Sequence, residues 1–194
     1  FMSYQCFINV QVLSMKFQTH KDSIDKAVRR IDAIIPHRDM GTMLSNLLVA
    51  VEAKQVSITA SDMETTARIT VPVESGQPGE FIIPAKQFQE YVGSLVSKDL
   101  IVEVETEENP DEGAAAFRVN LRGTSDASAR YVMPGNSAKH FPTLNRLSEN
   151  KLFSVSSALL EEMIRKTQYA ISQEDNRYIY NGVCFQGNGD QLTL

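Results

Sequence analysis

A strand-helix unit occurs twice in the chain, and this repeat constrains the fold more than any other feature. Phe17 and Phe153 each end a short predicted strand, and they are 153 − 17 = 136 residues apart. The helix after each strand carries an apolar stripe, and the two stripes match at the same offset: Ile24 with Leu160, Ala27 with Met163, Val28 with Ile164, and Ile31 with Thr167. Beyond the helices, strand residues 56–58 match 192–194, with a one-residue slip at Asn46 and Asn181. A repeat of this size predicts tandem domains, each a curved sheet covered by helices.

Periodicity within the first repeat predicts an α+β domain. The first helix follows a strand at 16–19 and has Asp22 or Ser23 as its N-cap. The second helix has Pro84 at its first position and buries the stripe Phe88, Tyr91, Val92 and Leu95. Alternation of apolar and polar residues predicts strands at 44–53, 56–60, 65–73, 80–83, 100–105, 116–121 and 128–133, and a further one at 183–185.

The repeat also predicts where the domains begin and end. We expect a complete domain at 15–134 and a connection rich in Pro, Gly, Asn and Ser at 135–150, held by Phe141 and Leu144. The first part of a second domain follows at 151–194, which is truncated because the counterpart of residues 60–62 would come after Leu194. Residues 1–14 precede a natural start at Met15, so we expect an upstream extension or a cloning remnant there, with an extra edge strand as the alternative.

Charge and cysteine content limit the classes of function. The net charge of −5 argues against a surface that binds nucleic acid everywhere, but it allows a local basic face. Lys26, Arg29 and Arg30 lie off the apolar stripe of the first helix, which is an ordinary solvated face unless other helices repeat it. Cys6 and Cys184 are far apart and lack metal-ligand spacing, which favours buried thiols in a reducing cytosolic compartment.

Catalytic and metal-binding patterns are weak in this sequence. His20, His37 and His140 have no partners at ligand spacing, and there is no phosphate loop or nucleophile elbow. Asp62 and Glu64 stand at a strand end, where a turn-capping role is favoured over a metal pair. We therefore expect no enzyme activity, metal or cofactor. The polar loop at 168–182, with one Arg and several aromatic side chains, could stack on bases, hold a phosphate or bracket an apolar peptide side chain, or it could simply be solvated.

Several short segments, in their order and spacing, resemble the bacterial DNA sliding clamp, the beta subunit of DNA polymerase III. They are Met15-Lys16-Phe17, Leu44 to Leu48, Ala60 to Glu64, Ile83 to Lys86, Phe141 to Leu144, and Asp175 to Gly182. The resemblance implies the DNA-clamp fold, with curved antiparallel sheets outside and helices lining a pore. Full-length members have three such domains, and two protomers close into a homodimeric ring around double-stranded DNA. The chain lacks the family's Thr-Asp-Gly-His-Arg-Leu segment and its third domain.

The resemblance also implies roles for individual residues. Lys26, Arg29 and Arg30 are expected to face the pore. Arg38 and Lys86 match basic family residues that contact DNA. Tyr178 matches a residue that meets DNA near the ring face, and Gln173 or Glu174 falls where the family often has a glutamine. Arg177 and Tyr180 match positions that help to form the pocket for the clamp-binding peptides of the replicative polymerase and the clamp loader, although the family often has Leu at the position of Tyr180.

The implied function is that of a cytoplasmic, non-catalytic processivity factor that slides on DNA without reading its sequence. Basic residues on repeated inward-facing helices would reconcile this function with a negative net charge. The alternative is a stand-alone interaction domain that pairs through exposed sheet edges. That alternative does not explain why helices with basic residues off the stripe are repeated.

Overall fold

The computed structural model describes residues 15–36, 43–108, 115–125, 130–142, 154–172 and 180–194. The chain divides into two units, Phe1–Asn145 and Arg146–Leu194, each of which is described by itself. The expected extension at 1–14 lies outside the described residues.

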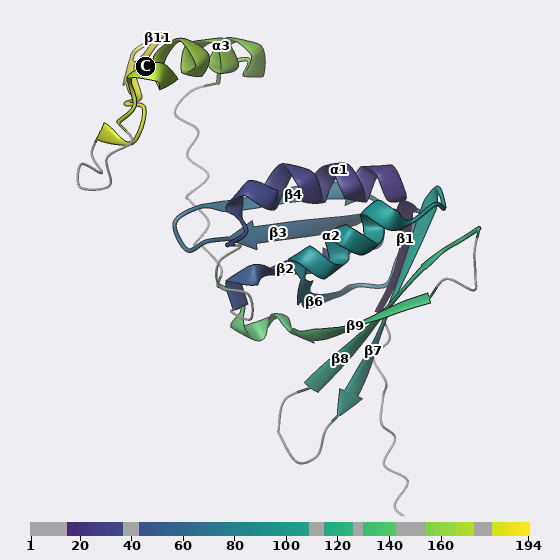
Figure 1. Cartoon of the computed structure of the whole chain (residues 1–194). Coiled ribbons are helices and arrows are strands. Elements are labelled where there is room, and N and C mark those ends of the chain that lie inside the picture. Colours follow the sequence, from purple (N-terminus) through teal and green to yellow (C-terminus); the bar gives the residue numbers. More distant parts are fainter. Residues whose placement is uncertain (1–14, 37–42, 109–114, 126–129, 143–153, 173–179) are drawn as a thin grey trace, which may run out of the picture. The chain divides into compact units, whose positions relative to one another are not determined.

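The described strands of the first unit form one antiparallel sheet of nine strands (Figure 1). Its order is β4-β3-β2-β6-β9-β8-β7-β1-β5. The strands are β1 (Met15–His20), β2 (Asn46–Val51), β3 (Gln55–Ser61), β4 (Thr66–Pro72), β5 (Ser75–Gly76), β6 (Gly79–Pro84), β7 (Asp99–Glu108), β8 (Ala115–Gly123) and β9 (Arg130–Ser137). Most of these strands were predicted from alternation, whereas β5 was not.

Strand β9 joins the two halves of this sheet. Its first part pairs with β8 up to Gly135, and its end pairs with β6 through Asn136 and Ser137. A Cβ atom on Gly135 would lie 3.0–3.2 Å from Val119 Cγ2, the carbonyl oxygen of Ile82 and Phe117 Cβ, so this crossing leaves little room for a side chain. The connection expected at 135–150 therefore begins inside a strand.

The sheet curls until its two ends approach each other. Strands β4 and β5 lie at opposite ends of the strand order, yet only two residues separate them in sequence. The link is held to β1, because Glu74 N donates to the carbonyl oxygen of Gln18 (2.9 Å). Just after β5, Gln77 N likewise donates to the carbonyl oxygen of Lys16 (2.8 Å). This closure places the ends of β1, the β4–β5 link and β7 close together.

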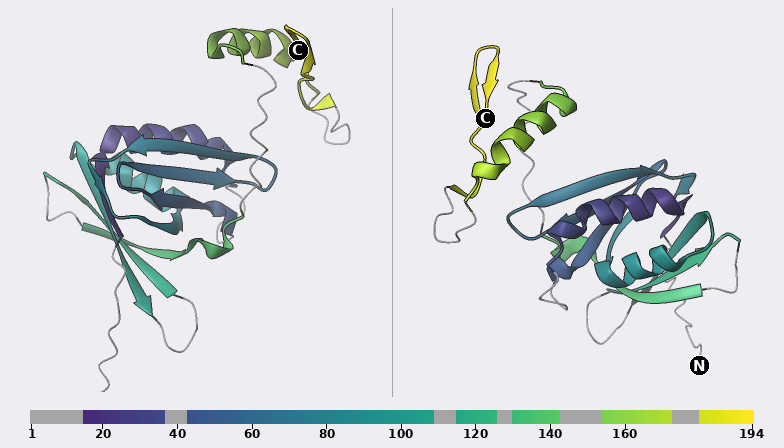
Figure 2. Two further views of the ribbon diagram at one scale, coloured as in Figure 1. Left: turned by 180° about the vertical axis from the view of Figure 1, so that it is seen from behind. Right: turned by 45° about the horizontal axis from the view of Figure 1, so that its top comes forward.

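Two helices, α1 (Lys21–Ile31) and α2 (Ala85–Ser94), lie side by side on the sheet (Figures 1 and 2). The predicted stripe of α1 is buried, and so are Phe88 and Val92 of α2. Short 3-10 turns occur at η1 (Asp32–Ile34), η2 (Met43–Ser45) and η3 (Ala138–His140). On the opposite face of the sheet, Phe141 packs against Leu48 and Ile82, which confirms its predicted role in holding the chain there. Leu144 lies outside the described residues.

The second unit repeats the plan of the first. It contains α3 (Ser157–Thr167), η4 (Gln168–Ala170), β10 (Gln186–Asn188) and β11 (Gln191–Thr193). Helix α3 and turn η4 begin and end 136 residues after α1 and η1. The hairpins agree as well, because the Cα partners Val51↔Val56 recur at the same offset as Gly187↔Leu192. The repeat predicted from the sequence is confirmed in these elements.

Four local predictions were wrong. Helix α1 has His20 as its N-cap, not Asp22 or Ser23, and the N–H of Lys21, its first residue, donates to the carbonyl oxygen of Lys98. Pro84 is the N-cap of α2, one position before the expected one. Residues 183–185 are not a strand, and Cys184 is exposed rather than buried. Among the described residues, no helix is long and apolar enough to span a bilayer.

Candidate nucleic-acid interface

Helix α1 buries one side in the core and exposes three cationic residues on the other. Ile24 and Val28 are buried, which turns Lys26, Arg29 and Arg30 toward solvent. Arg29 Nε lies 2.9 Å from Asp25 Oδ2, and this hydrogen bond raises the pKa of Arg29. Lys26 and Arg30 form no ion pair with the part of the chain that the structure describes, so their charges are available to an anion.

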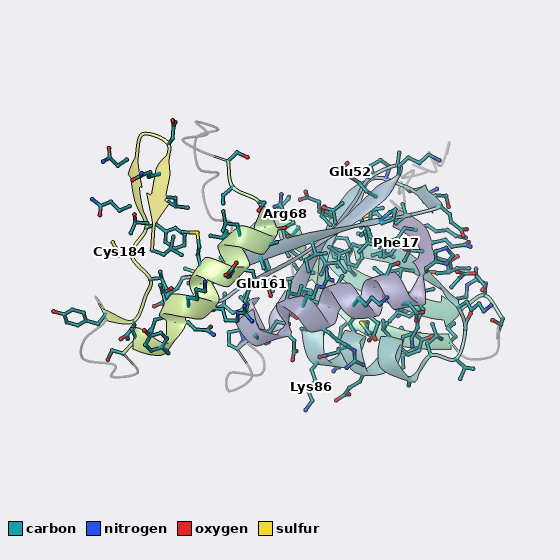
Figure 3. All side chains as sticks on the ribbon, turned by 90° about the horizontal axis from the view of Figure 1, so that it is seen from above. Phe17, Glu52, Arg68, Lys86, Glu161 and Cys184 are labelled. Atoms are coloured by element: carbon teal, nitrogen blue, oxygen red, sulfur yellow. The ribbon has the colours of Figure 1, made fainter. Side chains whose placement is uncertain are left out.

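Helix α2 adds Lys86 near its N-terminus. Its side chain is exposed and points away from the helix in Figure 3, whereas Phe17 lies inside the unit. Lys86 lines an open hollow between the end of α1 and the start of α2, together with Asp32, Ile35, Pro36, Ser45, Ala85, Gln89 and Glu90. Since α1 contacts α2, cations of both helices belong to one helical layer.

Helix α3 repeats the basic pair of α1. Arg165 and Lys166 are exposed in its last turn, as Arg29 and Arg30 are in the last turn of α1, and the offset is again 136. Lys166 Nζ lies 2.7 Å from Glu162 Oε1, and this hydrogen bond lowers the pKa of Glu162. Arg165 and Lys166 were missed in the sequence analysis, although extending the offset to the polar positions would have identified them.

Several predicted site residues cannot be placed. Arg38, Gln173, Glu174, Arg177 and Tyr178 lie outside the described residues. Tyr180 is described, and 63% of it is exposed. Its carbonyl oxygen accepts a hydrogen bond from Ser172 N (2.9 Å), which ties the two sides of the loop together.

The Asp62 carboxylate has the structural role that its position predicted. Asp62 Oδ1 accepts hydrogen bonds from the backbone N–H groups of Glu64 (2.9 Å) and Thr65 (2.5 Å). These bonds, chiefly the one from Thr65, lower the pKa of Asp62. They hold a tight turn in which Met63 has a positive φ of 79°. The turn-capping prediction is confirmed.

The arrangement on the helices suits phosphate binding without base recognition. Exposed lysine and arginine side chains can exchange among phosphates, and such contacts carry no sequence information. A family model described as DNA polymerase III beta subunit, N-terminal domain, matches residues 15–145, which is more than half of the chain. The chain belongs to this family.

Individual relatives agree with the family match. The chain is 27% identical over 179 residues to the beta sliding clamp of Pseudomonas aeruginosa and 26% identical over 181 residues to that of Escherichia coli K12. Each alignment covers 92% of this chain and 46% of the relative. The chain therefore spans about half the length of these relatives.

Solved structures show the same relationship. The DnaN sliding clamp (DNA polymerase III subunit beta) of Pseudomonas aeruginosa, bound to griselimycin, has a TM-score of 0.76 and 26% identity. The similarity covers 91% of this chain and 45% of that one. These structures confirm the clamp fold expected from the resemblance.

Proposed function

We propose that the full-length protein is a sliding clamp that acts as the processivity factor of a bacterial replicative DNA polymerase. One observation carries the proposal. In a chain of this family, a helix with an apolar stripe and a basic pair at matching positions occurs twice, 136 residues apart. A repeated cationic helix face suits a cylindrical polyanion that is contacted from several sides.

Retention on DNA would be topological in this proposal. Two protomers would close head-to-tail into a ring, so each phosphate contact could be weak and exchangeable while the ring stays in place. Lys26, Arg29 and Lys86 would contact the phosphates, and so would Arg38, Gln173 and Tyr178. Such contacts position the duplex without reading bases, which allows sliding.

The proposed partners are the replicative polymerase and the clamp loader, bound through their clamp-binding peptides. Arg177 and Tyr180 would form part of the peptide pocket. The exposure of Tyr180 supports this role, because a large aromatic side chain at the surface is a typical anchor for a bound peptide. The clamp would be non-catalytic, would need no cofactor and would work in the cytoplasm beside the polymerase.

Encirclement can be tested with the protein encoded by the complete reading frame. The protein is loaded on nicked circular DNA, and half of the sample is then linearised with a restriction enzyme. We expect retention on the circles and loss from the linear molecules, measured by gel filtration at moderate salt. Equal loss from both substrates would contradict encirclement. It would instead favour an interaction domain that pairs through sheet edges.

A further inference from the structure

Three side chains that are far apart in sequence meet where the sheet curls closed. His20 ends β1, Asp99 begins β7, and Glu74 lies in the link between β4 and β5. His20 and Asp99 are direct Cα partners, and Lys21 N donates to the carbonyl oxygen of Lys98 (2.8 Å). Backbone hydrogen bonds therefore fix the position of all three residues.

The side chains point at one another. His20 Nδ1 lies 2.6 Å from Asp99 Oδ1. Gln18 Nε2 donates to Glu74 Oε2 (2.6 Å), which leaves the second carboxylate oxygen of Glu74 available. One nitrogen or oxygen from each of the three residues lies within 4.8 Å of the other two. Among the described residues, neither Glu74 nor Asp99 forms an ion pair with a Lys or Arg.

We propose that His20, Glu74 and Asp99 form a binding site for a divalent first-row transition metal of the zinc class. An imidazole and two carboxylates are ligands that Zn²⁺ accepts, whereas Mg²⁺ and Ca²⁺ prefer oxygen ligands alone. Ligands about 2.1 Å from a tetrahedral ion lie roughly 3.4 Å apart. The His20–Asp99 pair, now 2.6 Å apart, must therefore open slightly, and one carboxylate oxygen of Glu74 must take up the same spacing.

The surroundings allow these movements. The His20 side chain is 69% exposed. Glu74 is also exposed, and its side chain has three rotatable bonds. Gln18 would orient the Glu74 carboxylate from outside the metal shell, as such outer hydrogen-bond partners do at metal sites. A bound ion would join β1, β7 and the β4–β5 link, and it would stabilise the folded state because the unfolded chain lacks the site.

The test is a titration of the full chain with zinc chloride, in which isothermal titration calorimetry measures the stoichiometry and the affinity. Cys6→Ser and Cys184→Ser form the background, so that thiols do not compete for the metal. We expect one zinc equivalent, with the affinity reduced at least about tenfold by His20→Gln and by Glu74→Gln. His140→Gln, which also removes one imidazole, should leave the affinity unchanged.

A second measurement separates metal loss from misfolding. Zinc should raise the unfolding temperature of the background protein but not that of Glu74→Gln, an isosteric change at an exposed residue. Equal zinc affinities in the background, His20→Gln and Glu74→Gln would overturn the proposal. Loss of binding in His140→Gln alone would overturn it as well. The outcome of this test does not depend on the proposed clamp function, since no DNA enters the experiment.

Discussion

At the residue scale, Glu103 on β7 forms ion pairs with a cation on each of the two neighbouring strands. Its Oε1 lies 2.8 Å from Lys16 Nζ on β1 and 3.0 Å from Arg122 NH2 on β8. The hydrogen bond from Lys16 lowers the pKa of Glu103 most, and the bond from Arg122 adds to the effect. Because the folded state binds this proton less readily than the unfolded chain, the ionised carboxylate stabilises the fold above the ordinary glutamate value of 4.5. That stabilisation is lost as the pH falls through the lowered pKa.

Glu103→Gln should therefore reduce the free energy of unfolding at pH 7 by up to about 1 kcal/mol, the range of partly exposed ion pairs. The difference from the parent protein should shrink as the pH falls below 4.5 and through the lowered pKa, where the carboxylate of the folded parent also becomes protonated. Urea unfolding of both proteins at pH 7 and at a pH below 4.5 measures this difference in the free energy of unfolding. Glu80→Gln, at an exposed position on β6, is the control and should change little. A penalty for Glu103→Gln that does not depend on pH would contradict the electrostatic assignment.

Which residues become neighbours was the hardest property to predict from the sequence. His20 had no partner at ligand spacing because Asp99 is 79 residues away and reaches it only through strand pairing. Asp22 and Ser23 are good N-cap types, but the helix already begins at Lys21, whose N–H donates to the carbonyl oxygen of Lys98 on a distant segment. The exposure of the cationic residues of α1 was easier to predict, since burial of one stripe determines which side chains are exposed.

Among the elements, α3 differs from α1 in how it starts. Ser156 is the N-cap of α3, and its Oγ accepts a hydrogen bond from Leu159 N (3.3 Å), whereas His20 gives α1 no side-chain cap. Ser156→Ala should destabilise the start of α3 by about 1 kcal/mol, because an N-terminal N–H loses its partner. Amide hydrogen exchange of residues 157–160 measures this. Ser157→Ala, one position later and also exposed, keeps the cap and is the control. Equal exchange in both variants would exclude a capping role for Ser156.

Elements with a clear period were predicted, and elements made by long-range pairing were not. The stripes of α1 and α2 and the alternation of β3, β4, β7 and β8 are visible in the local sequence. The end of β9 is not, because Pro134 and Gly135 are typical of a connection. Pairing of Ser137 with Phe81 extends the strand, and Gly135 suits the close approach between β8 and β6. Strand β5 likewise exists only because β1 pairs with it.

At the scale of the whole molecule, the repeat joins sequence, fold and proposed function. The same 136-residue offset relates the helices, the 3-10 turns and the register of the hairpins. The apolar stripe is buried on α1 and half-buried on α3, and it leaves the basic pair exposed at the same position on both helices. A polar pattern that repeats together with an apolar one indicates a shared ligand. The requirements of folding alone would preserve only the apolar pattern.

The final prediction concerns how DNA is held. In the full-length protein, the double variant Lys26→Gln/Lys86→Gln should weaken DNA binding and make the slope of log affinity against log salt shallower by about two, because each lysine neutralises one phosphate. The weakening should be the same on duplexes of different sequence, because bonds to phosphates do not read bases. Fluorescence anisotropy over a salt series measures both properties. The matched control Lys54→Gln/Lys139→Gln removes the same charge at exposed positions outside α1 and α2, and it should leave the slope nearly unchanged. Equal slopes for the two double variants would mean that net charge, and not the helix face, holds the DNA.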